Sequence, residues 1–399
     1  MSDAPLGGAR LLAGGALVNL CLGSLFSWSL FVGPLAGTFG RSAAAVSSVF
    51  SVAVVVFATV VLAGGRVVDR WPPGRIVLSA AVAGAVGLVI AARAASLVWV
   101  VVGYGVLFGI ANGLGYAAAV AVAGKSFGER RGFALGIVVG AYAAGPLVAS
   151  PVITAVLTRW DWRATFLVLA TGIGVALVAG GLLLGRGVDD RDDEDPGLPP
   201  GVGNRPLLLR PRGFTLWLAF LLGTLPALLV VAHAASIADA GGLSAAAVSA
   251  AVAVLGAGNL TGRAGGGWLS DRIGRLPGLR TATAGLAVAC VMLSLAAATA
   301  PVLVLMVLVG VGYGTQSSLI PALTADLFGT DHFGANYGRV FTGWGVAGLL
   351  GPQLGAWLGD GGDFGAALWV GAGSATAAFV LHTLLGRMGG AAPEAEAPA

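Results

Sequence analysis

Long apolar stretches recur along the whole chain, and they constrain its fold more than any other feature. Each runs for roughly 20 residues, the length that a helix needs to cross about 30 Å of hydrocarbon. Because a bilayer leaves no water for unpaired backbone groups, a spanning segment must be a helix or part of a closed barrel, and barrel strands are shorter and alternate in polarity. Charged residues make up only 10% of the chain, against about a quarter in soluble proteins. The sequence therefore predicts an all-α membrane protein.

We predict twelve transmembrane helices from these stretches. They cover residues 11–33, 44–65, 76–94, 97–123, 133–157, 164–185, 214–238, 243–269, 281–300, 302–325, 337–358 and 364–386. The 66 glycines fit such helices, because small residues let membrane helices approach closely. Cys21 and Cys290 fall inside predicted spans far apart in the sequence, so we interpret them as small packing residues and expect no disulfide.

The basic residues set the expected orientation, since Lys and Arg concentrate in cytoplasmic loops. With the N-terminus inside, four arginines fall on the outer side: Arg41, Arg93, Arg159 and Arg163. Arg263 lies within a span, and all other basic residues fall on the cytoplasmic side. We therefore expect a multi-pass protein of the cytoplasmic membrane with both termini in the cytoplasm. The same bias accounts for the net charge of +4, so we expect no nucleic-acid partner.

A charged stretch rich in proline and glycine divides the chain once, with six predicted spans on either side. An acidic run from Asp189 to Asp195 is followed by prolines and glycines, a composition typical of flexible linkers. We therefore predict an N-terminal six-helix bundle over 1–187, a cytoplasmic linker over 188–212 and a C-terminal six-helix bundle over 213–399.

The two halves repeat a short motif. Gly65-Arg66-Val67-Val68-Asp69-Arg70 follows the second span, and Gly267-Trp268-Leu269-Ser270-Asp271-Arg272-Ile273-Gly274-Arg275 follows the eighth, with the aspartates 202 residues apart. Such a repeat predicts two pseudo-symmetric bundles. An aspartate beside a glycine-permitted turn can cap a helix N-terminus and pair with arginines. We assign a conformational latch to Gly65, Asp69, Arg70, Gly267, Asp271, Arg272 and Arg275. The alternative is that these charges only anchor loops at the headgroups.

The second copy matches the G-x-x-x-D-R-x-G-R loop signature of the major facilitator superfamily, and the first matches it with a longer spacer before Gly74-Arg75. Within that superfamily the chain resembles the oxalate/formate antiporter family and related monocarboxylate transporters. The resemblance spans nearly the whole chain and rests on an ordered set of motifs: Phe26-Ser27-Trp28-Ser29 with Pro34, Gly113-Leu114-Gly115-Tyr116, Lys125-Ser126-Phe127-Gly128-Glu129-Arg130-Arg131-Gly132, Asp161-Trp162-Arg163, Asn259-Leu260-Thr261-Gly262-Arg263, Pro321, Ala325-Asp326-Leu327-Phe328-Gly329 and Asn336-Tyr337-Gly338. It implies a transporter that works by alternating access, in which two bundles rock about a central site.

Arg263 is the one charge in the apolar stretch from Leu243 to Leu269. A guanidinium inside a membrane is costly unless it faces a wet cavity or an anion. Asp271 lies eight residues further on, and a rise of about 1.5 Å per residue then places Arg263 roughly 12 Å above the cytoplasmic end. The resemblance implies that Arg263 is the cavity arginine that binds the substrate carboxylate, for which its bidentate fork is suited. The alternative is a structural arginine that pairs with a helix C-terminus or snorkels to the interface.

Two positions depart from the family pattern around this arginine. The oxalate transporters that the chain resembles carry a second cavity cation eight residues after the asparagine of the Asn-Tyr-Gly motif, and here that residue is Trp344. A dianion facing one cation would keep an uncompensated charge, so the sequence favours a monocarboxylate over oxalate. Proton-coupled relatives place an aspartate four residues before the arginine, where this chain has Asn259. An amide cannot carry the proton, which leaves the coupling partner open between a proton and a counter-anion.

Further substrate contacts are expected from aromatic and polar residues at positions that the family motifs imply. They are Phe26, Tyr116, Asn259, Tyr313 and Trp344. The four aromatic residues would leave an apolar box around the tail of the carboxylate. His233, near the outer end of the seventh span, is a candidate proton relay, because histidine is the residue type most used for that purpose near neutral pH. The alternatives are ordinary packing for the aromatic side chains and a hydrogen bond at the membrane interface for the histidine.

The sequence thus predicts a membrane transporter for a small organic anion, with a monocarboxylate favoured, and not an enzyme. Metal-ligand clusters, nucleophile and base pairs and dinucleotide motifs are not visible in it, so we expect no cofactor and no metal. We expect a monomer in the lipid bilayer. Two alternatives stay open: an exporter of drugs or amphipathic metabolites from the same superfamily, and a sensor that binds an organic acid without moving it.

Overall fold

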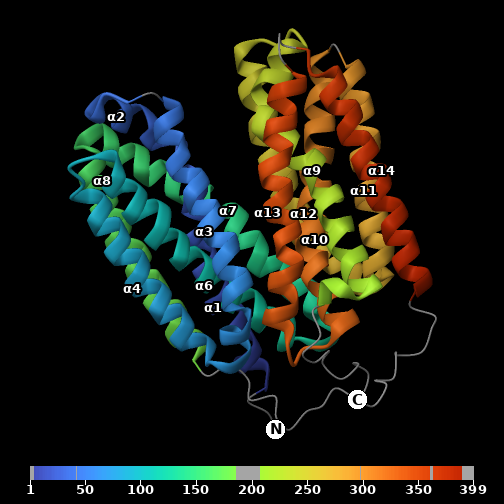
Figure 1. The fold of residues 1–399 in the computed structure, drawn as a ribbon, viewed down its shortest axis with the longest axis horizontal. Helices are drawn as coiled ribbons and strands as arrows, with labels where there is room; N and C mark the ends of the chain where they lie inside the picture. The colour runs from blue at the N-terminus through green and yellow to red at the C-terminus, as the bar shows by residue number, and fades with distance from the viewer. Residues whose placement is uncertain (1–3, 42, 186–206, 297, 360–362, 389–399) are drawn as a thin grey trace. The chain divides into compact units, whose positions relative to one another are not determined.

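This computed structural model describes residues 4–41, 43–185, 207–296, 298–359 and 363–388, and helices make up nearly all of these residues (Figure 1). The described residues contain no strand, so the prediction of an all-α protein is confirmed. Most of the predicted linker, residues 188–206, lies outside the described residues. Its last residues form the short helix η4 (Leu207–Leu209) and the start of the following long helix.

The chain forms two compact units, and each is built mainly from one half of the sequence. Unit 1 comprises residues 1–128, 137–195 and 332–338, and unit 2 comprises residues 129–136, 196–331 and 339–399. Two short segments are therefore exchanged: the first turns of a helix from each half belong to the unit of the other half. The predicted domain ranges, 1–187 and 213–399, did not contain this exchange.

The first half of the sequence, which supplies most of unit 1, holds the helices that correspond to the first six predicted spans. In chain order they are α1 (Ala4–Leu22), η1 (Gly23–Ser27), α2 (Ser29–Phe39), α3 (Ala43–Arg70), α4 (Pro73–Ala92), α5 (Leu97–Val100), η2 (Val101–Phe108), α6 (Gly109–Lys125) and, after η3 (Gly128–Arg130), α7 (Arg131–Arg159) and α8 (Trp162–Leu184). Helix α8 packs against α1 and α4, and α6 packs against α3 and α4. Figure 1 shows these helices in blue to green.

Unit 2 repeats this packing with the remaining long helices. They are α9 (Pro211–Ala240), α10 (Ala245–Ile273), α11 (Arg275–Leu295), α12 (Thr299–Phe328), α13 (Phe333–Leu358) and α14 (Gly365–Met388). Helix α14 packs against α9 and α11, and α12 packs against α10 and α11. Each pair stands in the same order within its half as the corresponding pair of unit 1. The two halves therefore share one architecture, as the repeated motif predicted.

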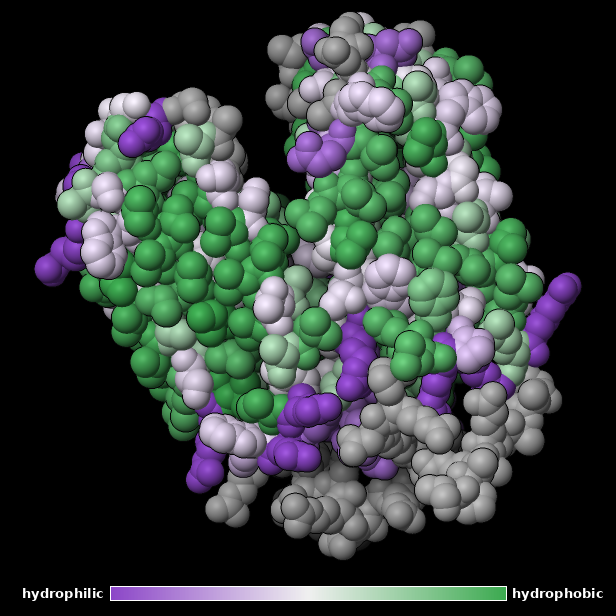
Figure 2. Space-filling model, viewed as in Figure 1, coloured by the Kyte–Doolittle hydropathy of each residue, from purple (hydrophilic) through white to green (hydrophobic). Residues whose placement is uncertain are grey.

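The lengths and surfaces of the helices suit a membrane. Ten helical segments of the described chain are long and apolar enough to cross one. Helices α10 and α13 complete the predicted twelve. Large apolar side chains such as Val82, Val175 and Leu182 are about two-thirds exposed, and Figure 2 shows hydrophobic residues over the sides of the helices. Exposed apolar faces of this extent are suited to lipid contact.

The repeated motif lies on helices and not in the loops where the sequence signature placed it. Gly65 to Arg70 forms the last turns of α3, and Gly267 to Ile273 forms the last turns of α10. The turn falls at Gly274, whose φ of 93° favours glycine, and α11 begins at the next residue. Hydropathy marks the end of a span at its first charges, whereas helical hydrogen bonds continue for another turn or two.

Candidate functional site

Arg263 lies on α10 with its side chain almost fully buried, at 7% relative exposure. Its Nε donates a hydrogen bond of 2.9 Å to Oδ1 of Asn259, one helical turn earlier. Its guanidinium carbon lies 5.6 Å from the ring centroid of Tyr313 on α12, within the range of a cation–π interaction. The amide that orients the guanidinium carries no charge of its own.

Aromatic residues of α12 and α13 complete this cluster. The indole Nε1 of Trp344 donates a hydrogen bond of 3.0 Å to the hydroxyl of Tyr313, and its ring stacks on Phe341 with centroids 5.0 Å apart. We call Asn259, Arg263, Tyr313, Phe341 and Trp344 the arginine cluster. Four of its five members were predicted from the sequence as substrate contacts, and all belong to unit 2.

Close packing of α10 against α12 holds Arg263 in place from the backbone side. A Cβ on Gly314 of α12 would collide with the carbonyl oxygen of Asn259, so only glycine lets the two helices approach this closely. The buried hydroxyl of Ser318 donates a hydrogen bond of 3.0 Å to the carbonyl oxygen of Arg263. Sequence reasoning missed Ser318, because a serine on an apolar helix carries no distinctive signal.

The two predicted aromatic residues of unit 1 gather around a tyrosine that sequence reasoning missed. Phe26 and Tyr116 meet the ring of Tyr142 edge to face, at centroid distances of 5.8 and 5.4 Å. The Tyr142 hydroxyl donates a hydrogen bond of 2.8 Å to Oδ1 of the buried Asn112. A signal for Tyr142 was present, since the 202-residue offset of the repeat carries it onto Trp344.

The first span is interrupted where Phe26 lies. Helix α1 ends at Leu22, and the 3-10 segment η1 carries Phe26, whose side chain is 42% exposed. The Tyr104 hydroxyl donates a hydrogen bond of 3.1 Å to the carbonyl oxygen of Leu25 in this segment. Broken helices of this kind are common at the binding sites of membrane transporters.

Tyr116 also bonds to the exchanged segment of α13. Its hydroxyl lies 3.3 Å from the hydroxyl of Tyr337, in the Asn-Tyr-Gly motif. Both residues belong to unit 1. Tyr116 therefore contacts Tyr337 in the first turns of α13 through its hydroxyl and Tyr142 through its ring.

His233 contacts the later turns of α13 and the residue before α14. Its Nε2 is 2.9 Å from the carbonyl oxygen of Pro352, and its ring lies 5.4 Å from that of Phe364. The backbone at His233 is not helical (φ −117°, ψ 16°), which marks a kink within α9. The structure thus places His233 at a bend of α9.

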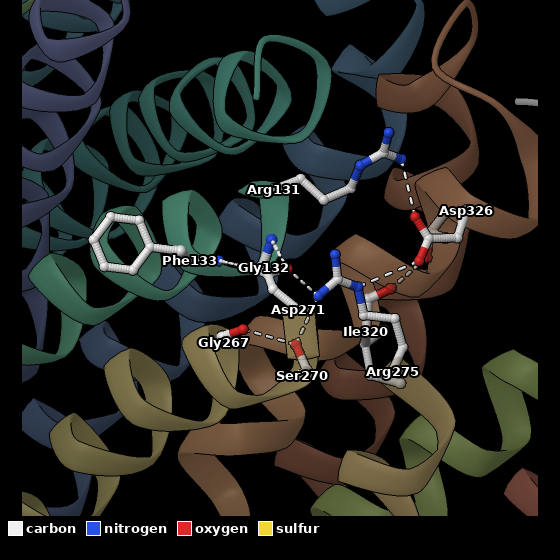
Figure 3. A network of polar contacts seen from close by, with 10 residues as sticks. Arg131, Gly132, Phe133, Gly267, Ser270, Asp271, Arg275, Ile320 and Asp326 are labelled. Carbon is white, nitrogen blue, oxygen red and sulfur yellow. Dashed lines mark hydrogen bonds and ion pairs between the residues drawn. The ribbon is translucent and has the colours of Figure 1, made fainter. Parts of the chain in front are cut away.

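Asp271 binds the N-terminus of α7 within unit 2 (Figure 3). Its two carboxylate oxygens accept hydrogen bonds from the backbone N–H groups of Gly132 at 3.1 Å and Phe133 at 2.8 Å, and it pairs with Arg275. The N–H groups of a first helical turn have no partner within the helix and carry partial positive charge, so a carboxylate is the preferred partner.

Asp326 extends this arrangement into a network of four charges. Arg275 Nε lies 3.3 Å from one oxygen of Asp326, and Arg131 Nη1 lies 3.0 Å from the other. Arg275 also donates a hydrogen bond of 2.8 Å to the hydroxyl of the buried Ser270. Acidic and basic groups alternate along the network, which compensates charges that are mostly shielded from water.

Asp69 makes the equivalent contacts within unit 1. It accepts hydrogen bonds from the N–H groups of Gly334 at 2.7 Å and Ala335 at 2.9 Å, in the first turn of α13, and pairs with Lys125 at 2.9 Å. The two backbone donors, Gly334 and Ala335, lie 202 residues after Gly132 and Phe133, whereas the paired cations, Lys125 and Arg275, do not stand at equivalent positions.

Two predicted latch arginines lie outside these networks, and three further residues lie within them. Arg70 is exposed, and the guanidinium of Arg272 lies over the indole of Trp268, 3.9 Å from its centroid. The residues that sequence reasoning did not assign to the latch are Lys125, Arg131 and Asp326. All three stand in motifs that carried the family resemblance, so the sequence marked them as motif residues but did not indicate their role in the latch.

Comparisons with known proteins agree with this architecture. The model of the Major Facilitator Superfamily matches residues 12–299 and 227–398. The oxalate:formate antiporter of Oxalobacter formigenes is 26% identical over 387 residues, which cover 94% of this chain and 91% of that protein. Monocarboxylate transporter 11 of Mus musculus is 28% identical over 382 residues, covering 89% of this chain and 82% of that protein.

A solved structure shows the same fold at low sequence identity. The crystal structure of a bacterial homologue of the iron transporter ferroportin superimposes with a TM-score of 0.74 at 16% identity, and the match covers 97% of this chain and all of the other. At this identity the likeness concerns the fold alone.

Proposed function

Because this chain belongs to the major facilitator superfamily, we propose that it is a secondary active transporter of a small organic anion, and specifically of a monocarboxylate. The names of two relatives, oxalate:formate antiporter and monocarboxylate transporter, support an anionic substrate. The observation that carries the proposal is the buried guanidinium of Arg263 in the middle of an apolar helix, oriented by the amide of Asn259 and packed near the ring of Tyr313.

The arginine cluster supplies one charge and an apolar surround. Arg263 is its one charged member, while Tyr313, Phe341 and Trp344 contribute rings. A guanidinium pairs with a carboxylate through two parallel N–H···O bonds, and the rings favour a hydrocarbon or aromatic tail. A second carboxylate would face no cation within the cluster, because Trp344 stands where related oxalate transporters carry a lysine. These features support a monoanion.

Alternating access would use the two carboxylate sites as latches. Asp69 holds the first turn of α13 in unit 1, and Asp271 holds the first turn of α7 in unit 2. Each helix continues into the other unit, so release of a latch would let the two units move relative to one another. The distribution of Lys and Arg supports an orientation in the cytoplasmic membrane with both latches and both termini on the cytoplasmic side.

Uptake into proteoliposomes tests the proposal. Purified protein should take up at least one labelled monocarboxylate, and Arg263→Ala should reduce that uptake strongly. Loss of one partner of a buried charge pair costs about 2 to 5 kcal/mol, which corresponds to a loss of affinity of about thirtyfold or more. Arg263→Lys should keep part of the activity, because it retains the charge without the planar fork.

The control is Arg387→Ala, an exposed arginine in the last turn of α14. This variant should transport at the rate of the unchanged protein. Uptake undiminished in Arg263→Ala would contradict the proposal. Resistance of expressing cells to amphipathic compounds, without carboxylate uptake, would point to an exporter, and binding without uptake would point to a sensor.

A further inference from the structure

Three glycines form a seam between the first turns of α7 and the last turns of α10, within unit 2. A Cβ on Gly136 would lie 2.5 Å from the carbonyl oxygen of Arg263, and one on Gly132 would lie 2.5 Å from Oδ1 of Asp271. A Cβ on Gly267 would collide with the backbone of Gly132. Side-chain carbons do not approach oxygen atoms this closely, so each position admits only glycine at the observed spacing.

The seam places the latch and the buried arginine on one rigid contact. Asp271 binds the N–H groups of Gly132 and Phe133 at one end of the seam. One turn further along α7, Gly136 lies directly against the backbone of Arg263. The same carbonyl oxygen of Arg263 accepts the hydrogen bond from Ser318. Arg263 is therefore held between α7 on one side and α12 on the other.

Unit 1 contains the same seam without the arginine. A Cβ on Gly338 would lie 2.6 Å from the carbonyl oxygen of Val61, and one on Gly334 would lie 3.1 Å from Oδ1 of Asp69. Gly338 and Val61 each stand 202 residues from their counterparts, Gly136 and Arg263. Both seams therefore press a glycine against a backbone carbonyl oxygen of the neighbouring helix. That carbonyl belongs to Arg263 in unit 2 and to Val61 in unit 1.

We propose that Gly136 is a positioning residue that sets the place of Arg263 according to whether the first turns of α7 are bound to Asp271. The inference rests on the proposed function, because it concerns how tightly the same arginine, Arg263, binds the substrate anion. A bidentate guanidinium and carboxylate pair requires its atoms to be placed within a fraction of an ångström. When α7 leaves the seam, Arg263 loses the contact on one side, and its affinity for the anion changes with it.

The test compares Gly136→Ala with its counterpart Gly338→Ala. Both variants introduce the same methyl group into equivalent seams, so both should lower the thermal stability of the purified protein by similar amounts. In Gly136→Ala the dissociation constant of the bound monocarboxylate should rise by about tenfold or more, the scale expected when a charge pair is misplaced by about an ångström. In Gly338→Ala it should stay within about twofold of the unchanged protein. Equal changes in the two variants, or none in Gly136→Ala, would overturn the inference.

Two further measurements keep the outcome decisive. Ser318→Ala removes the other restraint on the Arg263 carbonyl without adding bulk, so it should also raise the dissociation constant if Gly136→Ala fails to fold. Modification of Arg263 by phenylglyoxal, followed by peptide mass spectrometry, reports its environment without any ligand. The rate at which phenylglyoxal modifies Arg263 should change by at least about threefold in Gly136→Ala and should not change in Gly338→Ala. A threefold change corresponds to a shift of about 0.7 kcal/mol in the free energy of exposing the guanidinium to the reagent. A protein that binds no monocarboxylate but shows this difference would refute the proposed substrate and keep the coupling; an unchanged rate would refute the coupling.

Discussion

Arg263 and Asn259 form a pair in which the amide restrains the guanidinium and leaves its charge intact. The 2.9 Å hydrogen bond from Nε to Oδ1 fixes one edge of the guanidinium. On the proposed function, the carboxylate would therefore pair with the guanidinium away from this edge. Because the amide has no titrating proton, anion binding at Arg263 is not linked to proton uptake at this neighbour.

Replacement of Asn259 by aspartate should create that link. An ionised aspartate would neutralise Arg263, so an anion would bind well only after the aspartate takes up a proton. Affinity should therefore fall as pH rises, by up to about tenfold per pH unit, because each bound anion requires one proton. Titration calorimetry of the variant and of the unchanged protein across the neutral pH range would measure this slope. An Asn259→Asp variant whose affinity does not depend on pH would show that Asn259 does not control the charge of Arg263.

Sequence reasoning selected most residues of the arginine cluster, whereas among the aromatic residues of unit 1 it selected Phe26 and Tyr116 and missed Tyr142. Arg263 was detectable because a charge in an apolar span is rare, and Asn259, Tyr313 and Trp344 followed from motifs. Tyr142 carries no such signal by itself, since a tyrosine on a glycine-rich helix is equally suited to packing. Only the geometry of the folded helices brings it against Phe26 and Tyr116.

At the scale of elements, hydropathy located the long helices but not their irregularities. The break at η1 and the kink at His233 depend on tertiary contacts, such as the Tyr104 hydrogen bond to the Leu25 carbonyl oxygen. Polarity likewise misplaced the motif around Asp271 in a loop, because helix α10 continues past the apolar stretch. Periodicity and composition indicate which residues are buried. They do not indicate where a side chain replaces a helical backbone hydrogen bond and so breaks or bends the helix.

The two latch elements should differ in strength. In Asp271→Asn, Arg131 and Arg275 would share the single carboxylate of Asp326, whereas Asp69→Asn would leave Lys125 to be solvated by water. The side chain of Arg275 is 10% exposed and that of Lys125 is 22% exposed, so the cation in unit 2 is harder to solvate. We expect Asp271→Asn to lower the free energy of unfolding by about 1 to 3 kcal/mol, and Asp69→Asn by less.

Thermal unfolding of the purified variants would measure this difference. Asp239→Asn, at an exposed position near the end of α9, is the control and should unfold at the temperature of the unchanged protein. A larger loss in Asp69→Asn than in Asp271→Asn would contradict the ranking.

At the scale of the whole molecule, the chain is one structural repeat used twice. The repeat was predictable from two motif copies, and the match to the major facilitator superfamily confirms the resemblance. The exchange of the first turns of α7 and α13 between the units was not predictable, because nothing in their composition differs from that of the helices that follow. Arg263 breaks the symmetry, since its counterpart is Val61. The repeat thus supplies two carboxylates that bind helix N-termini, whereas the buried Arg263 occurs in one half alone.

Ligand-dependent thermal stability tests the proposed role of Arg263 most directly. A ligand that binds only the folded protein stabilises it by about 2.7 kcal/mol at a concentration one hundred times its dissociation constant. A panel of monocarboxylates, each paired with its neutral amide, should be compared on the unchanged protein, Arg263→Ala and Arg387→Ala. The account predicts that at least one carboxylate, and not its amide, raises the unfolding temperature of the unchanged protein and of Arg387→Ala, and that the rise disappears in Arg263→Ala. A rise that persists in Arg263→Ala, or that the amide reproduces, would contradict it.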